Sequence, residues 1–241
     1  MNNVIHKEKV AKFLEKGGDV ALLIGKKERS ELTRMIIANH ANWTKISSLP
    51  EKVFKAFENK MKEDCFVTEM KIPNPPEKGP YVVFEDRNGK MNILIDSRKS
   101  EKGVVHYRRC MAVVAYFTGI QGGIIEPQYQ ENGVVSFSDE DWILISIATR
   151  YCLMPGKLIK KIYLLTKIYE DEGALDKDKP FLQSFVDNIV FQTKVPEWAV
   201  YLRLRELAYS EEEVREYIQP RAIEDMIQEY RDRGGYTDEL V

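Results

Sequence analysis

One block of strand-like alternation lies between two regions in which apolar residues recur at the three-to-four-residue spacing of helices. In the first sixty residues the spacing is helical, with an apolar face at Val53, Phe54 and Phe57 after Pro50. From Cys65 to residue 95 apolar and polar residues alternate and β-forming residues dominate, and helical spacing then returns. This order predicts an α+β protein that is mostly helical and contains one small sheet.

The strand-like block is predicted to contain a β-hairpin. Residues 81–85 and 91–95 alternate around the segment 86–90, which contains Asn88-Gly89. Asn-Gly readily adopts the positive φ angles that a tight hairpin turn requires. A proline-rich break over residues 73–80 separates this hairpin from an earlier strand at 66–72. We therefore expect a small antiparallel sheet.

The remainder of the chain is predicted to be helical. Residues 108–118 are nearly all apolar beyond Cys110, which is typical of a buried helix, and Gly119 ends the run. Ser138, followed by Asp141 three positions later, is predicted to cap a helix that continues through Cys152. Pro155 stops that helix. Further helices are expected at 156–171, 181–191, 197–208 and 211–232, with breaks at Pro180, Pro196 and Pro220.

These patterns divide the chain into four parts. Residues 1–62 form a helical N-terminal region, 63–175 an α+β core, 176–233 a C-terminal helical part, and 234–241 a flexible tail. We find no internal repeat, so the division rests on the change of spacing and on the proline breaks.

Composition disfavours several classes of protein. The chain has 36 Lys and Arg against 38 Asp and Glu, and this near balance argues against strong non-specific binding to nucleic acid. Its longest apolar stretch, near residues 111–117, is far shorter than the ~20 residues of a membrane span, and the N-terminus does not resemble a signal peptide. Three widely spaced cysteines fit a reducing compartment. We expect a soluble cytoplasmic protein that does not associate with membranes.

Histidine is scarce in a way that limits catalysis. The only histidines are His6, His40 and His106, and histidine is the commonest metal ligand and general base near neutral pH. The sequence also lacks a G-x-S-x-G motif and the glycine-rich phosphate-binding motifs. Composition and motifs therefore point to no catalytic residue.

Two segments together resemble the ImmA/IrrE family of zinc metallopeptidases, bacterial and phage proteins that cut or control helix-turn-helix repressors. Cys152-Leu153-Met154-Pro155, after a helix containing Ala148, is similar to the family's A-x-x-L-L-M-P helix. Residues 191–207 resemble its F-x-V-S-x-x-A-x-x-x-R-L-x-x-L segment. The hairpin and the helices that start near Arg108 and Ser138 follow in the family's order. The resemblance spans about Cys65 to Tyr209 and implies a zincin-like core.

The residues that carry the family's chemistry are missing. The family binds zinc through H-E-x-x-H, whose histidines are ligands and whose glutamate activates the bound water, and a third ligand comes from a later helix. Aligned through Arg109, the H-E-x-x-H positions hold Val114, Ala115 and Thr118, and the third-ligand position falls near Trp142. A divalent ion there would lose its hydration without compensation. The resemblance thus implies the fold without the catalysis, and no cofactor.

One alternative keeps a metal. His106 and Cys110 have the spacing that places two ligands on one helical face, and Cys152 is a candidate third ligand. This site would make the chain a metallopeptidase with atypical zinc ligands. Against it, Arg108 and Arg109 lie between the two ligands, and the cysteines have apolar neighbours among which free cysteine is usually a packing residue.

A second alternative is DNA binding through a helix-turn-helix at residues 181–207. Arg203 and Arg205, with Arg215, would then contribute a basic stripe. However, Glu197 lies at the start of the second helix, where it would repel phosphate. We therefore treat this segment as part of the structural body, with Trp198 and Tyr201 as either packing residues or candidate partner contacts.

The sequence thus predicts a catalytically inactive ImmA/IrrE-like protein, a pseudopeptidase. Such a protein is expected to bind and regulate a protein partner, either a repressor or a host regulator. The resemblance also implies a gene carried by a phage or another mobile element. No sequence feature indicates an oligomeric state, and nucleic acid is not the expected partner.

Overall fold

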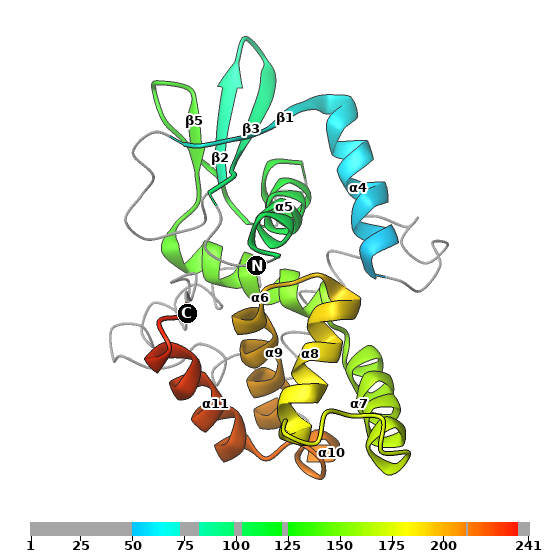
Figure 1. The fold of residues 1–241 in the computed structure, drawn as a ribbon. Coiled ribbons are helices and arrows are strands. Elements are labelled where there is room, and N and C mark those ends of the chain that lie inside the picture. The colour runs from blue at the N-terminus through cyan, green and yellow to red at the C-terminus, as the bar shows by residue number, and fades with distance from the viewer. Residues whose placement is uncertain (1–49, 73–81, 99–102, 122–124, 211, 236–241) are drawn as a thin grey trace.

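The computed structural model describes residues 50–72, 82–98, 103–121, 125–210 and 212–235 (Figure 1). The predicted helices before residue 50, the proline-rich break and the end of the tail lie outside this part of the chain. The described elements, in chain order, are α4 (Pro50–Asp64), β1 (Cys65–Met70), β2 (Val82–Arg87), β3 (Lys90–Asp96), α5 (Val104–Ala115), the π-helix η2 (Tyr116–Ile120), β4 (Gln128–Tyr129), β5 (Val134–Ser136), α6 (Asp139–Leu153), α7 (Gly156–Asp171), α8 (Phe181–Thr193), α9 (Glu197–Ser210), α10 (Glu212–Arg215) and α11 (Pro220–Asp232).

The fold is α+β, but its sheet is mixed and not purely antiparallel. The strand order is β1-β3-β2-β5-β4, and β1 pairs in parallel with β3, with Cys65 opposite Met91. The other neighbours pair antiparallel. Alternation specifies which face each side chain occupies, whereas the path between β1 and the hairpin determines strand direction. The expectation of an antiparallel sheet was therefore wrong for β1.

The predicted hairpin is confirmed, and its turn has the expected geometry. Asn88 and Gly89 have φ angles of 59° and 77°, the left-handed conformation that a two-residue hairpin loop favours. The Asp86 carboxylate also accepts a hydrogen bond of 3.0 Å from the Gly89 backbone N–H. The local residues thus determine the register of β2 and β3, in which Val82 lies opposite Ile95.

The buried helix starts earlier and ends differently than predicted. It begins at Val104, after Gly103 with φ of 88°, and a Cβ on Gly103 would come within 2.6 Å of the Lys194 carbonyl oxygen. After Ala115 the helix continues as the π-helix η2. In Figure 1, α5 lies against the sheet and above α6, which crosses the middle of the molecule.

The start and end predicted for α6 are confirmed. The Ser138 Oγ accepts a hydrogen bond from the Asp141 backbone N–H at 3.3 Å and donates to the Asp141 carboxylate at 2.7 Å. The helix ends at Leu153, and α7 begins directly after Pro155. Capping and proline act through the local backbone, which explains why both boundaries could be predicted.

The C-terminal helices surround α9. This helix contacts α6, α8, α10 and α11, and nearly every residue from Trp198 to Ala208 is buried. The break predicted at Pro220 is confirmed, because residues 212–232 contain two helices and Pro220 occupies the first turn of the second, α11. Buried side chains from Phe54 to Tyr230 form one continuous hydrophobic cluster. Among the described helices, none is long and apolar enough to cross a membrane.

Candidate functional site

The positions at which the resemblance predicts zinc ligands lie in the hydrophobic core. Val114 and Ala115 end α5, Thr118 is in η2, and Trp142 is in the first turn of α6. The exposed fractions of these four residues are 2%, 0%, 1% and 6%. The Thr118 hydroxyl donates a 2.7 Å hydrogen bond to the Val114 carbonyl oxygen within its own helix. No side chain at these four positions offers an imidazole or carboxylate to a metal ion.

Trp142 fills the space next to the sheet. Its ring stacks on Phe84 of β2 with centroids 6.4 Å apart, and it meets Phe137 edge-on at 5.3 Å. Phe84 and Phe137 also contact each other edge-on at 5.8 Å. Three aromatic rings therefore pack together where the third ligand would project, so this part of the fold is built as core.

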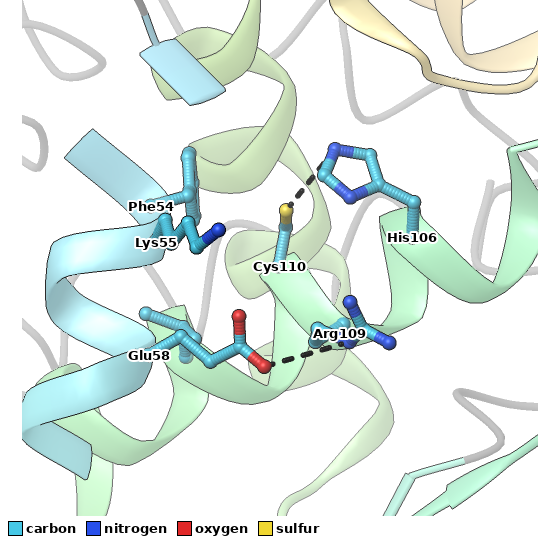
Figure 2. A pocket seen from close by; sticks show the side chains of 7 residues that line it. Phe54, Lys55, Glu58, His106, Arg109 and Cys110 are labelled. Carbon is cyan, nitrogen blue, oxygen red and sulfur yellow. Dashed lines mark hydrogen bonds and ion pairs between the residues drawn. The ribbon is translucent and has the colours of Figure 1, made fainter. Parts of the chain in front are cut away.

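A pocket lies between α4 and α5, one to two helical turns before Val114 on α5 (Figure 2). The His106 Nε2 and Cys110 Sγ atoms are 3.8 Å apart on one side of it, since residues four apart share a helix face. Its volume is about 160 Å³, and its lining residues are Phe54, Lys55, Glu58, His106, Arg109, Cys110 and Val113.

The carboxylate that lines this pocket, Glu58, is already engaged by cations. Glu58 forms ion pairs with Lys62 at 2.7 Å and with Arg109 at 3.6 Å, and Arg109 also pairs with Glu69 of β1. Figure 2 shows the Arg109–Glu58 pair beside the histidine–cysteine pair. Two positive side chains, Lys55 and Arg109, thus line the same small pocket and oppose the entry of a cation.

The third residue of the alternative zinc site, Cys152, does not complete it. Within the described ranges, no three His, Cys, Asp or Glu side chains are arranged to hold a metal ion. Burial raises the pKa of the Cys152 thiol to about 12, although the nearby charge of Arg203 partly opposes the shift. The structure therefore brings His106 and Cys110 together and leaves Cys152 apart.

We expect the three cysteines to react very differently with iodoacetamide at pH 8. With a pKa of about 12, Cys152 is a thiolate in roughly one molecule in ten thousand at that pH, and burial likewise raises the pKa of Cys65. Cys110 is only 2% exposed, but it lines the pocket between α4 and α5 next to an imidazole and should be modified first. Peptide mass spectrometry over a time course measures the three rates.

The matched control for this prediction is H106N, which keeps a polar side chain but removes the imidazole. It should slow Cys110 alkylation at least several-fold and leave Cys65 and Cys152 unchanged. Faster modification of Cys152 than of Cys110 in the folded protein would contradict the prediction.

A buried polar network joins α5, α6 and α9. The Glu206 carboxylate pairs with Arg150 at 2.6 Å and with Arg203 at 3.4 Å, and all three side chains are almost completely buried. Arg150 also donates to the Ser146 hydroxyl at 2.7 Å, and the Tyr107 hydroxyl lies 3.1 Å from the same oxygen. Sequence reasoning missed this network. The signal was one arginine in the part of α6 that follows its acidic first turn and is otherwise uncharged, and an Arg–Glu pair three residues apart on α9.

The same network connects the two segments that carry the family resemblance. Arg203, the arginine of the R-L part of the second segment, donates a 2.9 Å hydrogen bond from Nε to the carbonyl oxygen of Met154 in the first. Its guanidinium also lies 4.5 Å from the centre of the Tyr151 ring. Two short segments about fifty residues apart therefore form a single contact at the end of α6.

The residues proposed as partner contacts are buried, as are two of the three arginines of the proposed basic stripe, whereas Arg215 is exposed. Trp198 and Tyr201 are 2% and 1% exposed, so the assignment of these two rings to a partner surface was wrong. Trp198 packs edge-on against Tyr107 at 5.1 Å. Arg203 and Arg205 are also buried and cannot meet phosphates, although α8 and α9 are consecutive helices that contact each other. The spacing of apolar residues in this segment did not show whether α9 is a central helix or a surface helix.

A larger pocket, of about 560 Å³, lies between α8 and α11. Acidic and basic side chains both line it, including Glu197, Asp225 and Arg233. The Tyr201 hydroxyl donates to the Glu197 carboxylate at its edge. With both signs of charge present, the lining favours no single class of ligand.

Comparison of the chain with protein-family models, with curated proteins and with solved structures found no match.

Proposed function

We propose that this chain is a non-catalytic member of the ImmA/IrrE type of fold that binds a polypeptide and regulates it without cutting it. The observation that carries this proposal is the pairing of two features. The Arg203–Met154 contact supports a preserved framework, while Val114, Ala115, Thr118 and Trp142 occupy the ligand positions with buried core packing.

Because core side chains occupy the four positions aligned with the zinc ligands, the proposed function does not involve a metal ion. A divalent ion among these side chains would exchange its hydration shell for methyl groups and an indole ring, at a cost of several kcal/mol or more. One alternative retains a specific observation in its favour, the His106–Cys110 pair, which would supply two ligands of an atypical zinc site. The amount of zinc bound to the purified protein distinguishes the non-catalytic binding protein from the metallopeptidase.

The polypeptide is expected to bind at β1. This strand is the longer of the two edges of the sheet, with six residues against two in β4. Phe66 on β1 is 56% exposed, and the Lys90 ammonium lies 3.9 Å from its ring centre. Met70, four residues further along the same strand, is also exposed. An extended segment can add to such an edge through backbone hydrogen bonds, with specificity from alternate side chains.

The partner class follows from the resemblance. The family acts on helix-turn-helix repressors, so we propose a repressor or host regulator as the bound protein and a phage or mobile element as the origin of the gene. Sequestration of such a regulator requires only that its binding to the chain compete with its binding to DNA.

The first test measures metal and proteolysis in the intact protein. Metal analysis after purification with added zinc is expected to give much less than one equivalent, and a labelled repressor substrate is expected to remain intact. Stoichiometric zinc, with cleavage that a chelator stops and that H106A or C110A abolishes, would overturn the proposal in favour of the metallopeptidase.

The second test measures binding. Candidate helix-turn-helix regulators from the source genome are titrated against the immobilised chain, and F66S is expected to weaken the complex at least tenfold. Y129S, which changes an exposed ring on the opposite edge, is the matched control and should bind normally. If F66S and the unmodified chain bound with equal affinity, β1 would not be the binding edge. If none of the regulators bound, the proposed class of partner would be wrong.

A further inference from the structure

Helix α7 exposes large apolar side chains on the outside of the molecule. Leu164 and Ile168 are 54% and 49% exposed, whereas Ile159, Ile162 and Thr166 on the opposite face are buried. In Figure 1, α7 lies at the outer edge of the helical half, beside α8. A helix that buries one face against its own chain and leaves aliphatic residues on the other is suited to a further helical contact.

The exposed face of α7 has a regular spacing. Lys157, Lys161, Leu164, Ile168 and Asp171 follow one another at intervals of four and three residues, and all five are exposed. This is the spacing of a seam along which two helices pack side by side. The seam is basic at its first two positions, apolar at the next two and acidic at the last.

The charge distribution of the seam specifies how two copies can meet. Lysines at 157, 160 and 161 make the first part of α7 basic, and Glu170, Asp171 and Glu172 make its end acidic. In a parallel pair, like charges would lie opposite one another and repel. In an antiparallel pair each basic end meets an acidic end, so the surface is complementary to itself, as a two-fold interface requires.

We propose that the chain forms a two-fold homodimer through an antiparallel pairing of α7 with α7 of a second copy. Leu164 of each copy packs against Ile168 of the other, and the same register places Lys161 opposite Asp171 and Lys160 opposite Glu172. Asp171 already lies 3.8 Å from Lys167 of its own chain, but 66% of its side chain remains exposed to a second copy.

The size of the contact indicates a reversible dimer. A helix of 16 residues is about 24 Å long, and a single helix pair of that length lies at the small end of specific interfaces. We therefore expect a monomer–dimer equilibrium that shifts with protein concentration and weakens as salt screens the end charges.

Sedimentation velocity over a concentration series tests the dimer on the full chain. The unmodified protein is expected to shift from monomer to dimer, and I168E should weaken the dimer at least tenfold because it places a carboxylate against Leu164 of the other copy in an apolar contact. Y129E, which alters an exposed ring in the sheet, should dimerise normally. Thermal unfolding of both variants establishes that they fold. A purely monomeric protein up to about 200 µM would overturn the proposal.

Charge reversal tests the orientation. K161E and D171K are each expected to weaken the dimer several-fold, and the double variant K161E/D171K should recover most of the loss because the pair is restored with its signs exchanged. Disulfide trapping gives a second readout. A mixture of L164C and I168C should cross-link faster than either variant alone; faster self-linking of each variant would instead indicate a parallel pair and refute the antiparallel register.

Discussion

Replacing Glu206 with alanine is expected to lower the free energy of unfolding by about 3–5 kcal/mol. The carboxylate is fully buried between the guanidinium groups of Arg150 and Arg203, at 2.6 Å and 3.4 Å. Its removal leaves two buried positive charges without a counter-charge, in a region where Ser146, Tyr107 and the Met154 carbonyl are the remaining partners. Urea denaturation followed by circular dichroism measures the change.

Two further variants separate charge from volume. E206Q keeps nearly the same volume and is expected to lose most of the same stability, because both guanidinium charges stay uncompensated. E170A removes an exposed carboxylate that pairs with Lys167 at 2.5 Å, and should cost less than about 1 kcal/mol. Near-normal stability of E206Q would show that the network acts through packing and not through charge.

Replacing Trp142 with alanine is expected to lower the free energy of unfolding by about 3–5 kcal/mol, because removal of the buried indole leaves a cavity beside the rings of Phe84 and Phe137. Trp142 is 6% exposed and contacts the rings of Phe84 and Phe137. Guanidinium denaturation of W142A gives the loss, and W142F, which keeps one aromatic ring, should lose less.

F191A is the matched control for this prediction, since Phe191 is an aromatic residue that is largely exposed on α8. It should change the stability by less than about 1 kcal/mol. If W142A were as stable as F191A, Trp142 would not be a core residue, and the position would be open to a ligand as in an active peptidase.

The parts of the fold that local chemistry determines were predictable. Asn88-Gly89 determined the hairpin turn, Ser138 the start of α6, and Pro155 its end. Each of these acts on its own backbone or within three or four residues along the chain, so the sequence alone contains the information.

The parts that depend on distant segments were not predictable. The parallel pairing of β1 with β3 depends on how the strands come together in the sheet, which alternation along each strand does not specify. The sequence left Trp198 and Tyr201 as either packing residues or partner contacts and Arg203 as part of an alternative basic stripe, but all three are buried because α9 is enclosed by four other helices. Aromatic side chains, and charged side chains that are paired, occur in protein interiors as well as at surfaces. Residue type alone therefore could not decide whether these residues are buried.

The sequence by itself determined that the chain contains no H-E-x-x-H motif, because absence of a motif needs no structure to establish. Only the tertiary structure decided where the residues aligned with that motif lie. It packs Val114, Thr118 and Trp142 into the core, and it places His106 beside Cys110 in a pocket without Cys152. It also pairs Glu206 with two arginines far from solvent. The physical reason is that burial and charge pairing arise from contacts between segments distant in the chain, and residue spacing along one helix does not specify them.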